Sequence, residues 1–233
     1  MNSHNSNFTF QSWDSSLIQK SYAHRLGEVR MGDYLLKQSL SNAKYVIIGI
    51  RECCGPLANN GRIGAQFAFP AFVTAFLNAQ VHEQYPKESL CVLGEVVEME
   101  PSVPGQSPDK VPELDSFLEQ ILDTYVNASQ IPIFIGGGHN NALAVMRWAA
   151  KHKKLAVVNL DAHADLRSTD VRHSGNSFST AMEEGVLLHY SVLGLHEGYN
   201  NAFIREALKS DQIFHSYYED YLFQKRNLLD DLT

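Results

Sequence analysis

The chain has 233 residues, of which 44% are hydrophobic, and its 26 Asp and Glu side chains outnumber its 19 Lys and Arg. This length and apolar content predict a globular domain with a sizeable core. The sequence has no basic run of the kind that binds nucleic acid or an anionic membrane surface. It also has no secretory signal pattern and no apolar stretch long enough to cross a bilayer, so we expect a cytoplasmic protein.

The chain begins with a polar stretch, MNSHNSNFTFQS, which predicts a flexible arm over residues 1–12. Residues 13–233 are expected to form one domain. Asp14, Ser15 or Ser16 has a side chain suited to cap a helix that begins at this point.

Beyond residue 43, short apolar runs alternate with stretches of helical spacing. We expect strands at 44–50, 90–97, 131–135, 155–160 and 188–195, and helices at 69–78, 114–126, 140–152 and 201–209. Uniformly apolar strands are usually covered on both faces, so the fold class is α/β: a three-layer α/β/α arrangement with a mainly parallel sheet. The clearest unit is residues 131–160, one βαβ crossover whose two strands we expect to be neighbours.

The three cysteines, Cys53, Cys54 and Cys91, are an odd number and have no CxxC spacing. This pattern predicts reduced thiols rather than a disulfide framework or a zinc site, and we assign them no function.

Side chains that can bind metal follow two of the predicted strands. His139 follows the strand at 131–135, and Asp161, His163 and Asp165 follow the next strand at alternate positions. If the chain stays extended there, the latter three point to one face. Ligands bind at the carboxyl ends of parallel strands, and carboxylates with some imidazole suit Mn²⁺, so these four residues predict a metal site.

Each of these residues also has a structural explanation. A lone Asp after a strand is often a turn former, a lone His is often hydrogen-bonded, and GGG is often a tight turn. The segment GGGHNN could instead hold a phosphate at a helix start, but the sequence contains neither GxGxxG nor GxxxxGK[ST]. Four ligand-type residues at two strand ends favour the metal site.

Two segments resemble metal-binding motifs of the ureohydrolase family, which includes arginase, agmatinase and formimidoylglutamase. IFIGGGHNN is similar to the family's Gly-Gly-x-His motif, and VVNLDAHADLR to its Asp-Ala-His-x-Asp motif, in the family's order. NNGRIGAQFAFPAFVTAFL and VLGEVVE are similar to earlier segments, so the resemblance runs from about Val46 to Tyr221. GGGH in place of GGDH is closer to the formimidoylglutamase branch.

The resemblance implies hydrolysis of a linear amidine or guanidine at two manganese ions. His139, Asp161 and Asp165 would bind one ion, and His163 with a bridging Asp161 would bind the other. In such a site, hydroxide between the ions attacks the amidine carbon.

The segment HSGNSF is similar to the one that precedes substrate-facing residues in relatives. It gives His173 and Ser174 as catalytic candidates, with His173 as the acid or base, and Asn176 as a substrate-binding residue. His196 follows the strand at 188–195 and is a second substrate-binding candidate that could line the same cleft, although a position on the loop surface fits the sequence equally well.

Family members continue into a strand bearing Ser-x-Asp-x-Asp-x-x-Asp-Pro, whose first two aspartates complete both metal sites. This sequence stops at Thr233 without that motif, and we expect Asp230 and Asp231 to be solvated charges. We therefore expect an arginase-like fold that is incomplete at its C-terminus, has an exposed sheet edge and holds one manganese ion or none well.

Two functions follow from this comparison. The first is a manganese-dependent hydrolase of a small amidine or guanidine, with doubtful activity, in a homo-oligomer. The alternative is a catalytically silent scaffold or oligomer subunit with at most one metal.

Overall fold

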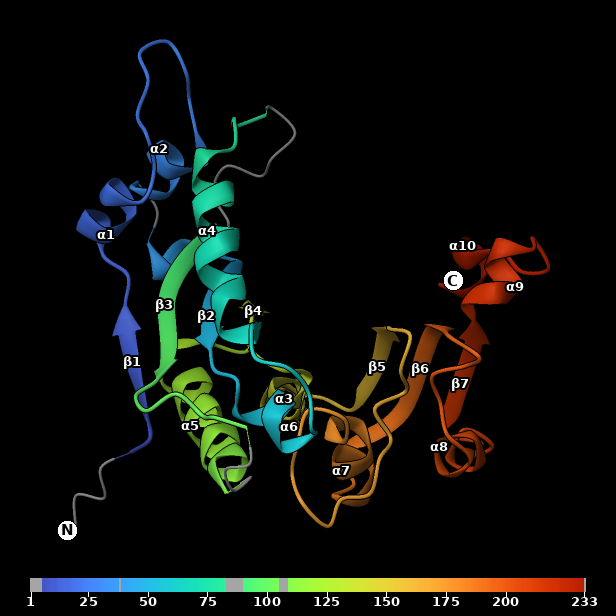
Figure 1. Ribbon diagram of the computed structural model, residues 1–233. Helices are drawn as coiled ribbons and strands as arrows, with labels where there is room; N and C mark the ends of the chain where they lie inside the picture. The colour runs from blue at the N-terminus through green and yellow to red at the C-terminus, as the bar shows by residue number, and fades with distance from the viewer. Residues whose placement is uncertain (1–5, 38, 83–89, 105–108, 233) are drawn as a thin grey trace.

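The computed structural model describes residues 6–37, 39–82, 90–104 and 109–232, and these residues form an α/β fold with two sheets (Figure 1). The first sheet has the order β1 (Phe8–Ser12), β3 (Leu90–Glu98), β2 (Tyr45–Arg51) and β4 (Ile131–Ile135). The second has the order β5 (Leu155–Leu160), β6 (Leu187–Leu195) and β7 (Ile213–Tyr217). Every strand pair is parallel except β1 with β3, which confirms the predicted fold class.

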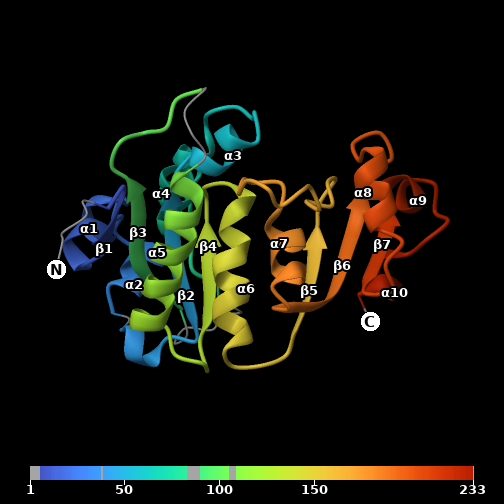
Figure 2. The same ribbon diagram turned by 90° about the horizontal axis from the view of Figure 1, so that it is seen from below.

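Helices cover both faces of the first sheet (Figure 2). One face carries α1 (Ser15–Lys20), α2 (Met31–Leu35) and α4 (Ala68–Asn78), and the other carries α5 (Lys110–Tyr125) and α6 (Ala142–Ala150). Short helices follow several strand ends: α3 (Cys54–Ala58), α7 (Ser177–Glu183), α8 (Ala202–Ala207), α9 (Tyr218–Leu222) and α10 (Leu228–Asp231). Within the described part of the chain, no helix has the length and apolarity needed to span a bilayer.

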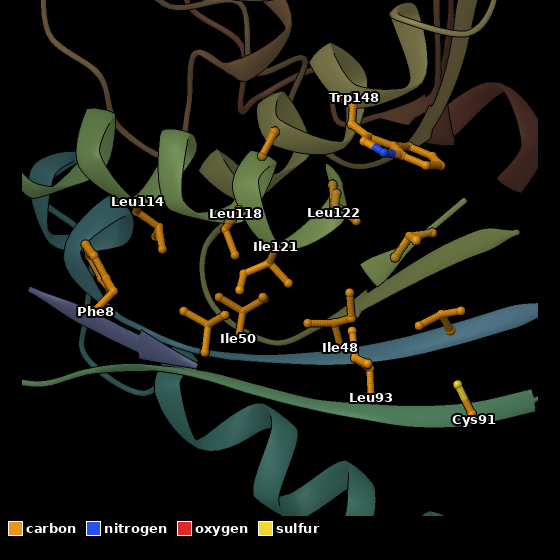
Figure 3. Packing of buried hydrophobic residues seen from close by; sticks show 14 of the residues in the cluster. Phe8, Ile48, Ile50, Cys91, Leu93, Leu114, Leu118, Ile121, Leu122 and Trp148 are labelled. Carbon is orange, nitrogen blue, oxygen red and sulfur yellow. The ribbon is translucent and has the colours of Figure 1, made fainter. Parts of the chain in front are cut away.

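The first core lies between the sheet and α5 (Figure 3). Ile48 and Ile50 alternate along β2 and point to the same face of the sheet. Leu114, Leu118 and Leu122 recur every four residues on α5 and meet them, and all five side chains are fully buried. Truncating a leucine in such a core costs about 2–5 kcal/mol, so this packing fixes the position of the sheet.

Helix α6 contributes to two cores and joins the two sheets. Ala144 and Trp148 pack in the first core, whereas Leu143 and Met146 pack in a second core with α7 and β6. The two sheets therefore share one helix even though they share no hydrogen-bonded strand pair.

The prediction of a flexible arm over residues 1–12 is wrong for Phe8–Ser12, which forms β1; residues 1–5 lie outside the described part. Phe8 is buried, and its ring centroid lies 6.3 Å from that of Phe117 on α5. Phe10 packs against the same core, so the alternation of the two phenylalanines supplies the strand signal that the polar surroundings concealed.

Several boundaries also differ from expectation. Helix α5 begins at Lys110 rather than at residue 114. Pro112 is tolerated because it lies in the first turn, where a missing backbone N–H costs little. The expected long loop after β2 contains α3. Asp231, which we expected to be solvated, forms an ion pair with Arg226, in which Arg226 Nη2 lies 2.7 Å from Asp231 Oδ1. The cysteines are buried and make no disulfide.

The prediction that the strands of residues 131–160 are neighbours is wrong. β4 pairs only with β2, and β5 pairs only with β6, so the crossover joins strands of different sheets. Sequence patterns cannot predict this separation, because strand order depends on residues far along the chain.

A buried ion pair fastens the loop after β5 to the first half of the molecule. Arg172 donates from Nε to Asp115 Oδ2 at 2.9 Å and from Nη2 to Asp115 Oδ1 at 3.2 Å. Nη2 also donates to the carbonyl of Asn140 at 3.2 Å. Burial raises the pKa of Asp115, whereas Arg172 stabilises its charged form.

We predict that Arg172→Met lowers the free energy of unfolding by about 3–5 kcal/mol, because it leaves Asp115 buried without its cation. The double variant Arg172→Met with Asp115→Leu should recover much of this loss. The matched control is Lys209→Met, which breaks an exposed pair with Glu206 and should change little. Urea denaturation checks all three variants, and equal effects of Arg172→Met and Lys209→Met would contradict the prediction.

Candidate metal centre

The turn after β4 requires glycine. Gly136 and Gly137 have φ angles of 91° and 67°, in the region that side chains disfavour. A Cβ on Gly137 would lie 2.4 Å from Asn141 Nδ2. The turn leads directly into a 3-10 helix, His139–Asn141, whose first residue is the predicted ligand.

Glu52, a fully buried residue at the end of β2, holds this turn in place. Its Oε1 accepts hydrogen bonds from the N–H of Gly138 at 2.5 Å and from Asn141 Nδ2 at 3.1 Å. Its Oε2 accepts one from the N–H of Gly55 at 3.1 Å. Because a carboxylate already occupies the glycine turn, an anionic phosphate would be repelled there, which removes the phosphate alternative.

The segment after β5 is a turn rather than the extended chain that we expected. Asp161 Oδ1 accepts a hydrogen bond from the N–H of His163 at 3.0 Å, and Asp165 has a φ angle of 50°. Ala164 is anchored on both sides, by Asn200 Oδ1 on its N–H at 3.1 Å and by Tyr190 Oη on its carbonyl at 2.9 Å. The turn, not strand alternation, therefore directs the two aspartates.

Three of the four predicted ligands converge. His139 Nδ1 lies 2.7 Å from Asp165 Oδ2 and 3.2 Å from Asp161 Oδ2, and the three donor atoms lie within 4.8 Å of one another. His163 is beside this cluster, with Nδ1 3.6 Å from Asp161 Oδ1 and its ring stacked on Tyr199 at 5.3 Å between centroids.

The cluster lies in a cleft with a volume of about 290 Å³. The lining residues come from the segments after β2, β4, β5 and β6: Pro56, Asn59, His139, Asp161, His163, Asp165, Arg167, Ser174, Tyr199 and Ile204. Polar side chains and one cationic side chain, that of Arg167, thus lie around the three potential metal-binding atoms.

The two aspartates stabilise the protonated form of His139. Hydrogen bonds to Asp161 and then to Asp165 raise the pKa of His139 to about 9, against the opposing effect of burial. Burial is the largest influence on Asp161, but hydrogen bonds from His139 and from the N–H of His163 outweigh it and lower the pKa of Asp161. A proton on His139 therefore supplies the positive charge that the carboxylates require.

This donor set fits a divalent cation. One imidazole nitrogen and two carboxylate oxygens are hard to borderline ligands that suit Mn²⁺. A bound ion would take the place of the proton on His139, because only the neutral imidazole has a lone pair to donate.

The two catalytic candidates from HSGNSF lie close to the cleft. Ser174 lines it, and its Oγ accepts a hydrogen bond from Asn59 Nδ2 at 3.3 Å. His173 Nδ1 accepts from the N–H of Gly175 at 3.0 Å, and burial, together with Arg167 and Arg172, lowers the pKa of His173. Their catalytic roles stay predictions.

The prediction that Asn176 faces substrate is wrong, because its side chain is fully buried and its amide is used inside the loop. Asn176 Nδ2 donates to the carbonyls of Ser168 and Val171 at 2.8 Å each, and Oδ1 accepts from the N–H of His173 at 3.1 Å. Asn176 shapes the loop that carries the candidates.

His196 lies behind the cleft rather than on its lining. Its ring stacks on Tyr199 at 4.4 Å between centroids, and Nδ1 lies 3.3 Å from Glu219 Oε1. Tyr199 also stacks on His163, and His196 is not among the residues that line the cleft, so a substrate-binding role for His196 stays a prediction.

Four residues at or beside the cleft were not predicted from the sequence: Glu52, Asn59, Arg167 and Tyr199. Arg167 follows Asp165 by two residues, within the motif that gave the ligands, so proximity could have pointed to it. Nothing in the sequence marks Glu52, because its partners are mainly amides of a turn far along the chain.

Comparison with known proteins places this geometry in a family context. The arginase family model matches residues 43–228. Formimidoylglutamase from Streptococcus pyogenes serotype M3 is 29% identical over 171 residues, which are 69% of this chain and 49% of that protein. The chain thus spans about half the length of the curated relatives it matches.

Solved structures share the fold. Trypanosoma cruzi formiminoglutamase with Mn²⁺ superposes with a TM-score of 0.66 at 22% identity, covering 88% of this chain and 70% of that one. Bacillus subtilis formimidoylglutamase gives a TM-score of 0.66 at 16% identity, covering 100% and 68%. Proclavaminate amidino hydrolase from Streptomyces clavuligerus gives 0.57 at 21% identity, covering 77% and 60%.

We predict that Mn²⁺ binds more tightly as pH rises, by about tenfold per unit between pH 6.5 and 8, because each ion must displace a proton from His139, whose pKa is about 9. Above that pKa the dependence should level off. His139→Asn should weaken binding and remove the dependence, whereas His189→Asn, an exposed residue on β6, should change neither. Electron paramagnetic resonance of unbound Mn²⁺ gives the affinity; a pH-independent value for the unaltered chain would contradict the assignment.

Proposed function

The chain belongs to the arginase family, and we propose that it is a manganese-dependent hydrolase of a linear amidine, with formimidoylglutamate as the favoured substrate. The observation that carries the proposal is the convergence of His139 with Asp161 and Asp165 from the ends of two strands. The names of the S. pyogenes, B. subtilis and T. cruzi relatives support the choice of substrate.

His139, Asp161 and Asp165 would hold the first ion. His163, whose Nδ1 lies 3.6 Å from Asp161, would hold a second with Asp161 as the shared ligand. Divalent ions in this position would lower the pKa of water enough to supply a nucleophile near neutral pH. Because the described residues supply only two ligands to the second ion, we infer that it is held weakly.

His173 is suited to handle the proton of the leaving amine. Its Nδ1 accepts from the Gly175 N–H, so the neutral ring carries its proton on Nε2. Burial, together with Arg167 and Arg172, lowers the pKa of His173, which favours the neutral ring. This tautomer can donate a hydrogen bond from Nε2 to the leaving nitrogen, and it can accept a proton only at Nδ1, after the Gly175 N–H moves away.

Arg167 favours a substrate that carries a carboxylate. The guanidinium is the one Lys or Arg side chain on the lining of the cleft in the described residues, and it pairs with carboxylates through parallel hydrogen bonds. Formimidoylglutamate and arginine contain a carboxylate, whereas agmatine does not. We therefore infer that agmatine is the poorest of the three substrates.

A catalytically silent scaffold is the second candidate. The observation that favours it is the ligand cluster itself, which has three members among the described residues. A family member that binds one ion and lacks turnover would still keep this cluster and the fold.

We predict that the 233-residue chain retains no more than one tightly bound Mn²⁺ after dialysis and hydrolyses formimidoylglutamate far below the rate of about ten per second typical of enzymes. Asp161→Asn should remove both the ion and the residual rate, because the variant keeps the shape but loses the shared negative charge. Asp123→Asn, at an exposed position on α5, is the control and should retain both. Elemental analysis and release of formamide check the prediction.

Two outcomes would contradict this function. Manganese binding without any manganese-dependent release of formamide, ammonia or urea would favour the scaffold. A residual rate that survives Asp161→Asn would show that hydrolysis occurs elsewhere.

A further inference from the structure

A second cavity, distinct from the metal cleft, lies against the loop that follows β5. Its volume is about 480 Å³, within the range of pockets that hold small molecules. The lining comes from residues 166–170, from α7 and α8, and from the segment that leads into β7. Both helices lie on the same side of the second sheet, where they contribute to the second core (Figure 1). Among the described residues, Arg167 is the one that lines both the cavity and the cleft.

The inner side of this cavity is apolar. Met182, Ala207 and Ile213 line it and pack against the second core. Phe203 forms part of the wall, although 61% of its surface is exposed. A ligand that covers these side chains removes apolar surface from water, which favours binding. The face of a phenylalanine ring also attracts a cation.

Two carboxylates form a polar side of the cavity, and hydroxyl groups of the loop hold both. Ser168 Oγ donates to Asp170 Oδ2 at 2.5 Å, and Thr169 Oγ1 donates to Glu183 Oε2 at 2.8 Å. Among the described residues, the second oxygens, Asp170 Oδ1 and Glu183 Oε1, have no hydrogen-bond partner. Both can therefore accept a hydrogen bond from a ligand.

The charge of the lining favours a cationic ligand. Asp170 and Glu183 supply two negative charges, against one positive charge on Arg167. The backbone of Arg167 is fixed, because its N–H donates to the carbonyl of Gly175 at 3.1 Å and its own carbonyl accepts from Ser179 Oγ at 2.7 Å. An anion would meet two carboxylates at this cavity, whereas a cation would meet two acceptors.

We propose that this cavity binds a small organic ammonium ion, in which a primary amine is joined to an apolar alkyl or aryl body. The ammonium group would donate to Asp170 Oδ1 and Glu183 Oε1, and the body would cover Phe203 and Met182. A charged donor gives stronger hydrogen bonds to carboxylates than a neutral hydroxyl does. The ligand would join the loop at 166–170 to α7 and α8. Because the cavity is distinct from the metal cleft, this proposal does not rest on the proposed function.

The experiment compares three probes of similar shape that differ in charge: 2-phenylethylamine, 2-phenylethanol and phenylacetate. Each is titrated into the 233-residue chain at pH 7 in EDTA, so that neither metal nor catalysis affects the result. We expect the amine to bind with a Kd below about 1 mM, and the alcohol and the acid to bind at least tenfold more weakly. Equal binding of the amine and the alcohol, or no binding of the amine at about 10 mM, would overturn the proposal.

Variants of the lining locate the bound amine. Glu183→Gln and Asp170→Asn keep the shape of exposed side chains and remove their charge, so the chain should fold but bind the amine about tenfold more weakly. Phe203→Ala should weaken the amine as well, because it removes the exposed ring. Glu206→Gln, at an exposed position on α8 outside the cavity, is the matched control and should bind normally. Amine binding that is unchanged in both carboxylate variants would place the amine elsewhere and overturn the proposal.

Discussion

The candidate metal centre depends on the segments after β4 and β5 lying close together although no hydrogen bonds join these two strands. In a continuous parallel sheet, this alignment follows from strand pairing. Here it rests on α6, which packs in both cores, and on Arg172, which binds Asp115 on α5 and the carbonyl of Asn140. Side-chain contacts thus replace backbone pairing as the restraint that sets the distance between His139 and the aspartates.

Carboxylates are neutralised in three different ways around this centre. Glu52 accepts hydrogen bonds mainly from amides of the glycine turn, and Asp115 is paired with a permanent cation, Arg172. Asp161 and Asp165 are paired with His139, which can lose its proton. Only in the third arrangement can a metal ion replace the proton that supplies the positive charge. The titration of His139 therefore distinguishes the candidate metal centre from the ion pairs that support it.

Only part of the candidate site could be predicted from the sequence. Asp161, Asp165 and His139 are strand-end residues, and the rule that ligands bind at the carboxyl ends of parallel strands predicted that they lie near each other, although the two strands are not neighbours in one sheet. Asn176 was misplaced, since its amide binds the carbonyls of Ser168 and Val171, a local contact that has no sequence signature. Glu52 was overlooked because most of its partners lie in a turn more than eighty residues away.

The fold, too, could be predicted only in part: the positions of strands could be predicted, but their pairing could not. The strands at 44–50 and 90–97 were predicted within a residue or two, since uniform apolar runs mark them directly. The pairing of strands was not, because adjacency in a sheet depends on contacts between distant segments. The uniformly apolar composition of β4 and β5 predicted that both strands are covered on both faces. In the structure, however, most residues of both strands are partly or fully exposed.

We propose that His139, Asp161 and Asp165 form a manganese site. Anomalous diffraction at the manganese edge, from crystals of this chain grown with Mn²⁺ at pH 8, tests it most directly. We expect a peak within bonding distance of His139 Nδ1 and of one carboxylate oxygen from each aspartate. A map with no peak there, or with the main peak held by other residues, would contradict it.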